Sequence, residues 1–143
     1  MFSHTPLRAV VTALVLGAAS TPCLATHWVE IGVTGPDSDT LLVDVDSLRM
    51  ADGLRVLDIM TRYSNPRRNA NDLMLDRYIQ TTAFDCKKRT YALVHTVGYL
   101  GAQHFGSDHE VEGWQDKMST LPDDSLSNRI FAIACPSASP GAH

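Results

Sequence analysis

Apolar and polar side chains alternate over several stretches of the chain, and this alternation predicts β-strands. In residues 40–46, Leu41, Val43 and Val45 share one parity while Asp44 and Asp46 share the other, as in a strand with one buried face. Stretches rich in β-forming residues predict further strands at residues 27–33, 54–63, 78–84 and 89–99, and an edge strand at residues 109–114. Short turns separate these stretches, so we expect one antiparallel sheet of five to six strands.

Turn-forming residues mark where the predicted strands end. Asp52-Gly53 is a strong signal for a tight hairpin turn before residues 54–63. The Gly-Pro-Asp segment at residues 35–37 ends the first strand, and residues 85–88 are expected to form another turn. Residues 67–76 are polar and the least regular part of the chain. We expect a mobile loop there.

The last element changes to a helical period. Residues 122–125 combine a proline, two acids and a hydroxyl, which together favour a helix start. The apolar residues that then recur at helical spacing are Leu126, Ile130, Ile133 and Ala134. Cys135 closes this helix and Pro136 stops it. The predicted fold class is therefore α+β, a single antiparallel sheet with one flanking C-terminal helix over residues 26–136, followed by a disordered tail at residues 137–143.

Residues 1–25 have the features of a secretory signal peptide. Arg8 gives a weakly basic start, residues 9–19 form an uncharged apolar run, and residues 20–25 supply a proline and small residues for cleavage. The run is shorter than the ~20 apolar residues that cross a bilayer. A lipid anchor at Cys23 would need a small residue where Pro22 stands. We expect an exported protein in the periplasm, outside the cell or at its surface, with neither a lipid anchor nor a transmembrane segment.

Cleavage after Ala25 would leave two of the three cysteines, Cys86 and Cys135. An even pair in an exported chain favours a disulfide over the alternative of two unpaired thiols. The bond would close a loop of roughly 50 residues and stabilise the fold by about 4 kcal/mol in the chain-entropy description. The cysteines lie too far apart in sequence for a catalytic Cys-x-x-Cys pair, so we expect a structural bond.

Length and charge bound the remaining possibilities. The 143-residue chain has a net charge of −4, and loss of Arg8 with the signal segment makes the rest slightly more acidic. Sequence-independent binding to nucleic acid draws its affinity from Lys and Arg contacts to phosphate, so an acidic chain is a poor candidate for it. The length is that of one domain.

Several segments, in their order, resemble the surface-adhesin protein E-like domain family of exported bacterial proteins. They are an early Trp28, the VDVDSLR segment before the Asp-Gly turn, the Asp-Cys pair at residues 85–86, a tyrosine-containing strand up to Gly98, then Trp114 and a closing helix that ends in Ala-Cys. The resemblance implies a six-stranded antiparallel sheet, a flanking C-terminal helix joined to it by a disulfide, and homodimerisation as an option. Its best-known member looks like an outer-membrane lipoprotein that binds host matrix and plasma proteins.

The run Lys87-Lys88-Arg89 is the densest basic patch of this acidic chain. At the tip of a hairpin it would contact an anionic ligand such as a glycan, a heparin-like chain or an acidic protein surface. Residues 67–68, both arginine, are candidates to join it in space. The alternative is a solubilising turn that discourages pairing between sheet edges.

Other candidate sites are weaker. His104, Asp108, His109 and Glu110 fit no standard zinc spacing, so we expect a solvated loop and neither a metal nor a cofactor. Residues 44–46 (Asp-x-Asp) start like a calcium loop, but the glycine that such a loop requires is missing.

The chain also lacks the standard catalytic motifs. It has no G-x-S-x-G and no C-x-x-C. A disulfide would remove Cys86 as a nucleophile paired with His95, and the pair Asp58 and Asp85 cannot be judged without a fold. We therefore expect no enzyme.

Two functions from different classes remain. The first is an exported, adhesin-like binding module that contacts a protein or matrix ligand through an open sheet edge and the basic turn. The second is a periplasmic carrier of a small molecule or metal, or a minor hydrolase. A concave apolar pocket ringed by Tyr63, Tyr91 or His95 would favour the second, and a convex sheet with exposed aromatic residues would favour the first.

Overall fold

The computed structural model describes residues 26–106 and 109–136, so the predicted signal peptide and tail lie outside the described residues. The sheet has seven strands, and β1 to β6 follow one another in space as they do in sequence, each antiparallel to the next. The elements are β1 (Trp28–Thr34), β2 (Asp39–Ala51), β3 (Leu54–Arg68), β4 (Met74–Asp85), β5 (Thr90–Leu100), β6 (Gln103–Gly106), η1 (Trp114–Lys117), β7 (Ser119–Thr120) and α1 (Ser125–Ala134).

The fold class is only partly as predicted. The antiparallel sheet and the C-terminal helix are confirmed, but the domain is largely β, with a ten-residue helix beside a seven-stranded sheet. The Asp52-Gly53 turn is confirmed in detail, because both residues have positive φ, at 51° and 76°. Positive φ at both central positions is the geometry of the type I′ turn, whose twist matches that of the strands it joins.

The predicted loop at residues 67–76 is wrong in extent. Arg67 and Arg68 still belong to β3 and pair with the start of β4, which leaves only residues 69–73 as a loop. Asn69 closes that loop, since its side-chain oxygen accepts from the backbone N–H of Asn71 at 2.9 Å and of Leu73 at 3.0 Å. Backbone pairing carried the strands further than the side-chain pattern indicated.

The predicted edge strand at residues 109–114 is also wrong. Residues 103–106 form the edge strand β6, and Gly113, with φ 63°, leads the chain into the short 3-10 helix η1. Trp114 is 4% exposed and packs on the sheet, and its indole nitrogen donates to the Glu110 carboxylate at 3.1 Å. Burial of the large indole ring and one backbone hydrogen bond, from the Val111 N–H to the Val94 carbonyl at 2.7 Å, hold this segment on the sheet.

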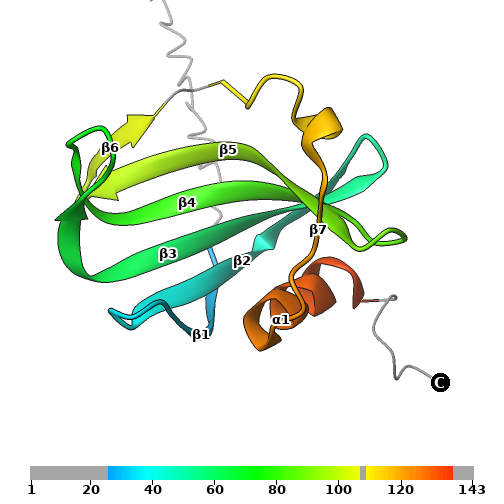
Figure 1. Ribbon diagram of the computed structural model, residues 1–143, viewed down its shortest axis with the longest axis horizontal. Helices are drawn as coiled ribbons and strands as arrows, with labels where there is room; N and C mark the ends of the chain where they lie inside the picture. The colour runs from blue at the N-terminus through cyan, green and yellow to red at the C-terminus, as the bar shows by residue number, and fades with distance from the viewer. Residues whose placement is uncertain (1–25, 107–108, 137–143) are drawn as a thin grey trace, which may run out of the picture.

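Two layers cover the two faces of the sheet. Figure 1 shows the long strands arching over the side where α1 lies, with η1 on the other side. The core under α1 includes Val43, Leu57, Phe84, Ile130 and Phe131. The core under η1 is smaller and consists of Val56, Ala83, Ala92, Val94 and Trp114. The neighbours Val56 and Leu57 in β3, and Ala83 and Phe84 in β4, are therefore buried on opposite faces of the sheet, so apolar residues adjoin there without alternating with polar ones.

α1 confirms the predicted helix and its start. Asp124 is its N-cap, and one carboxylate oxygen accepts from the Ser127 backbone N–H at 2.8 Å while the other accepts from the Ser127 hydroxyl at 2.7 Å. These hydrogen bonds, the backbone one foremost, lower the pKa of Asp124 from its ordinary value of 3.8. From the middle of α1, Arg129 donates to the carbonyl of Ile31, which lies in the bulge of β1.

Removing the cap should destabilise the fold in a pH-dependent way. We expect Asp124→Ala to lower the thermal midpoint by a few degrees at neutral pH, because the Ser127 N–H loses its acceptor. A carboxylate whose pKa is lowered by folding stabilises the fold above its unfolded pKa, and this contribution is lost as the pH falls through the folded pKa. The difference between wild type and variant should therefore shrink below pH 3.8. Asp124→Asn, which caps without charge, is the matched control, and an unchanged midpoint in Asp124→Ala would contradict the assignment.

Candidate functional site

The predicted basic run occupies the turn between β4 and β5, and we call Lys87, Lys88 and Arg89 the basic turn. The Asp85 side chain shapes it, since one oxygen accepts from the backbone N–H of Lys87 and of Lys88, both at 3.0 Å. An Asp side chain that bonds to the backbone two and three residues later is a standard turn device. Cys86 is joined to Cys135 by a disulfide, with a Cα–Cα distance of 5.6 Å. The predicted bond from sheet to helix is confirmed.

The three basic residues differ in what they contact. Arg89 faces α1, because its guanidinium donates to the Asn128 side chain at 2.7 Å and lies 4.6 Å from the centre of the Phe131 ring. Lys87 and Lys88 are exposed, and the Lys88 side chain, 78% exposed, keeps its ammonium 3.9 Å from Asp85. All three residues are exposed, but Arg89 also holds the turn on α1, so Lys87 and Lys88 are better placed to contact a ligand.

Arg67 and Arg68 do not join the basic turn. They pair with the first residues of β4, whereas the basic turn follows its last residue. β4 has 12 residues, so at ~3.3 Å per residue the two places are on the order of 35 Å apart. The expectation that these arginines complete the patch is wrong, because the hairpin places them at the opposite end of the sheet.

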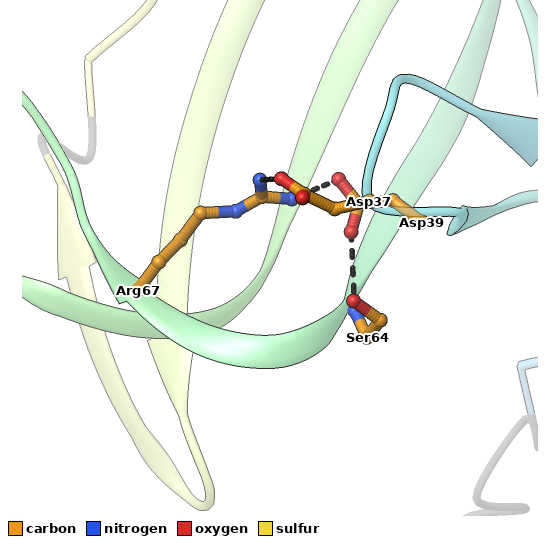
Figure 2. A network of polar contacts seen from close by, with 4 residues as sticks. All are labelled: Asp37, Asp39, Ser64 and Arg67. Atoms are coloured by element: carbon orange, nitrogen blue, oxygen red, sulfur yellow. Dashed lines mark hydrogen bonds and ion pairs between the residues drawn. The ribbon is translucent and has the colours of Figure 1, made fainter.

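Arg67 instead belongs to a polar network that joins the β1–β2 turn to the end of β3 (Figure 2). Its guanidinium pairs with Asp37 at 2.7 Å and with Asp39, and Asp39 also accepts from the backbone N–H of Ser64 at 3.1 Å. Asp39 is 7% exposed, so its carboxylate lies largely out of water, whereas the Arg67 side chain is 37% exposed. A carboxylate with both oxygens engaged in this way fixes the position of the chain around it.

The network also positions an aromatic wall. The Arg67 guanidinium carbon lies 3.9 Å from the centre of the Tyr63 ring, and the Tyr63 and Tyr78 rings are 5.7 Å apart. Burial raises the pKa of Tyr63, and the neighbouring Tyr78 raises it further. The Tyr63 phenol therefore stays protonated and uncharged at physiological pH.

Two cavities adjoin this wall on the α1 side of the sheet and share Tyr78. The first, about 290 Å³, lies between Tyr63, the loop at residues 69–73, Gly98 and Phe105. The second, about 250 Å³, lies between the start of α1 and the middle of the sheet, with Thr61, Gln80, Thr82, Phe84 and Tyr91 on its floor. We call the two together the groove. Tyr63 and Tyr91 line it as expected for a pocket, while His95 lines neither cavity.

Both edges of the sheet are interrupted, which bears on strand addition by a partner. β1 has a bulge between Glu30 and Gly32, and its Ile31 carbonyl accepts from Arg129 at 2.5 Å. The other edge carries the four-residue β6 and the two-residue β7. Interrupted and short edges discourage pairing with another chain. Among the described residues, the edges therefore offer only short runs of backbone to a partner.

The catalytic candidates do not come together. Cys86 is held in the disulfide, so it is not available as a nucleophile for His95. Asp58 pairs with Thr81 and accepts from its hydroxyl at 2.7 Å, whereas Asp85 lies at the end of β4, roughly 13 Å further along the strand.

The metal candidates are separated as well. Asp108 lies outside the described residues, and among those described no three His, Cys, Asp or Glu side chains gather into a metal-binding group. Asp44 is 4% exposed and accepts from the Asp46 N–H at 3.1 Å within β2. The alternation in residues 40–46 predicts that Asp44 lies on an exposed face of the strand, and this is wrong.

Sequence reasoning named Tyr63 and Tyr91 for a pocket but missed the rest of the groove. Its floor follows one parity of β4, namely Tyr78, Gln80, Thr82 and Phe84. This parity mixes aromatic, amide and hydroxyl side chains, while a core-facing parity is usually aliphatic or aromatic throughout. That mixture was visible in the sequence, but it acquires meaning only once α1 is known to pack on Phe84 and to leave a cavity beside Gln80 and Thr82.

The fold is a largely β domain closed by a disulfide, with an exposed turn and an open groove. The chain belongs to the surface-adhesin protein E family, whose model matches residues 28–136. No curated protein and no solved structure matches it. Family membership indicates an exported surface protein that acts by binding rather than by catalysis. In the described part of the chain, no helix has the length and apolar character to span a membrane.

Proposed function

We propose that this protein is an exported, adhesin-like binding module that contacts an anionic protein or matrix ligand through Lys87 and Lys88. The observation that carries the proposal is that both lysines are exposed on a turn held in place by its neighbours. Asp85 holds the turn from within, the disulfide at Cys86 ties it to α1, and Arg89 docks on Asn128. A binding surface that is ordered beforehand loses less entropy when a ligand binds.

The setting proposed for this activity follows from the signal segment. Cleavage after Ala25 would leave a domain at residues 26–136 in the periplasm, outside the cell or at its surface, without a lipid anchor. Such compartments are oxidising, in keeping with a structural disulfide. Homodimerisation stays a prediction from the family.

Reversing the two lysines should abolish most binding to an anionic polymer. We expect Lys87→Glu/Lys88→Glu to weaken binding to immobilised heparin about tenfold, because two favourable contacts are replaced by repulsion. The matched control is Arg62→Glu/Arg68→Glu, which changes the net charge equally at exposed positions of β3. Surface plasmon resonance at low and physiological salt measures both. Equal loss in the two variants would show that only net charge matters, and no loss would show that the basic turn is not the site.

A second candidate function, binding of a small molecule, is favoured by a specific observation. The groove contains two adjoining cavities of about 290 and 250 Å³ on the α1 side of the sheet, next to the start of α1 and beyond it. Ligand sites are typically concave and mostly apolar, with a few polar groups that orient the ligand. The groove has this composition, and it lies apart from the basic turn, so the two functions can coexist in one domain.

A further inference from the structure

Polar groups without partners stand on the floor of the groove. Thr61 and Thr82 are each only 6% exposed and line the second cavity. Neither hydroxyl forms a hydrogen bond with another side chain or with the backbone in the described residues, and neither does the amide of Gln80 between them. Both hydroxyls still reach solvent through the cavity, because among the described residues the buried side-chain atom that lacks a partner is Nε of Arg67. Hydroxyl and amide groups that face a cavity and have no partner in the protein are placed to form hydrogen bonds with a ligand or with water.

The lining excludes charge. Within the described residues, no Asp, Glu, Lys, Arg or His side chain lines either cavity. The ionisable groups that do line them are tyrosines, and burial raises the pKa of Tyr63, which keeps it neutral. A charged ligand would lose its hydration here without gaining an opposite charge.

Two other neutral ligands fit less well. An acyl chain would cover the Thr61 and Thr82 hydroxyls and the Gln80 amide with hydrocarbon and leave them unbonded. A peptide would need backbone partners, but β3, β4 and β5 already pair with one another at the floor. A neutral ligand must therefore be recognised by side chains that both donate and accept hydrogen bonds, and by aromatic surfaces.

We propose that the groove binds a short neutral oligosaccharide. Sugar hydroxyls donate and accept hydrogen bonds as Thr, Gln and Asn side chains do. Each sugar hydroxyl can therefore be either donor or acceptor to the polar side chains on the floor of the groove. The apolar C–H faces of a pyranose ring can lie against the rings of Tyr78, Tyr91 and Phe105, whose faces carry negative charge density. Tyr78 belongs to both cavities, so a chain of several sugar units would pass over it. This inference rests on the second candidate function and names its ligand class.

Titration with neutral tetrasaccharides tests whether the groove binds a neutral oligosaccharide. The full exported protein is titrated with cellotetraose, maltotetraose and N-acetylchitotetraose at millimolar concentrations and followed by NMR. We expect at least one to shift the amide signals of β4 and β5. Thr61→Val/Thr82→Val keeps the shape of both side chains but removes the hydroxyls, so affinity should fall about 25-fold, at roughly fivefold for each lost hydrogen bond. Lys87→Glu/Lys88→Glu is the control, and it should bind as tightly as wild type.

Three results would overturn the proposal. One is the absence of any shift with all three sugars, and another is equal affinity in wild type and the double valine variant. The third is binding of a fatty acid that becomes tighter in the double valine variant, because an apolar ligand gains from the lost hydroxyls. That third result would reject the saccharide while retaining a small-molecule function, so the two proposals can fail separately. Thermal unfolding of the valine variant shows whether its fold is intact, and Gln80→Leu gives an independent removal of a floor group.

Discussion

Replacing Cys86 and Cys135 together by alanine should lower the free energy of unfolding by about 3–4 kcal/mol. The bond joins residues 49 positions apart, and opening a loop of that size returns conformational entropy to the unfolded chain. The expected loss is a large fraction of the total stability of a domain of this size. Denaturant unfolding at neutral pH, monitored by tryptophan fluorescence, measures it.

The reduced wild type provides the control for this experiment. It should unfold at the same denaturant concentration as the double alanine variant, because both lack the same covalent link. If the variant unfolded together with the oxidised wild type, the bond would contribute nothing to stability. Loss of the bond should also speed hydrogen exchange at the end of α1 and in the basic turn, since Cys86 and Cys135 tie these two segments together.

Phe131→Ala should destabilise the fold by about 3–5 kcal/mol, the usual range for truncating a buried phenylalanine. Phe131 is 3% exposed, and its ring meets that of Phe84 edge to face at 6.3 Å between centres. Arg89 stacks on the same ring at 4.6 Å. The side chain therefore joins helix, sheet and basic turn at one point, and its removal leaves a cavity among all three.

Phe131→Leu is the matched control and should lose less stability, because it refills most of that volume. The two variants should also differ in the basic turn, since only a ring can hold the Arg89 guanidinium by stacking. Denaturant midpoints give the stability, and NMR signals of the Lys87 and Lys88 amides report the turn. A loss below about 1 kcal/mol for Phe131→Ala would mean that Phe131 is not a core residue.

The elements that could be predicted are those whose causes are local. Asp52-Gly53 forms its turn because these two residues tolerate positive φ, whatever surrounds them. Asp124 caps α1 through a hydrogen bond to Ser127, three residues away. The disulfide was inferred from the number of cysteines and the compartment, neither of which depends on the packing.

The elements that could not be predicted depend on contacts between distant residues. Residues 109–114 alternate in a way that favours a strand, yet Trp114 buries its ring on the sheet and the chain forms η1 instead. Arg67 has the appearance of a solvated loop residue, but Asp37 and Asp39 hold it in place across the β1–β2 turn. The residues that Trp114 and Arg67 contact are far from them in sequence, so the pattern of neighbouring residues does not predict these contacts.

By itself, the sequence determined that this protein is an antiparallel sheet with a capped C-terminal helix, one disulfide and a basic turn. Periodicity, turn chemistry and cysteine number act over a few residues or through composition, which is why they could be recognised without a fold. The tertiary structure alone decided that Arg89 is used by the helix and that Arg67 lies at the far end of the sheet. It also decided that Thr61, Gln80 and Thr82 face an open groove. The place of Arg67 depends on the pairing of β3 with β4, and the other two outcomes depend on where α1 packs on the sheet. Both are set by contacts between residues far apart in the chain.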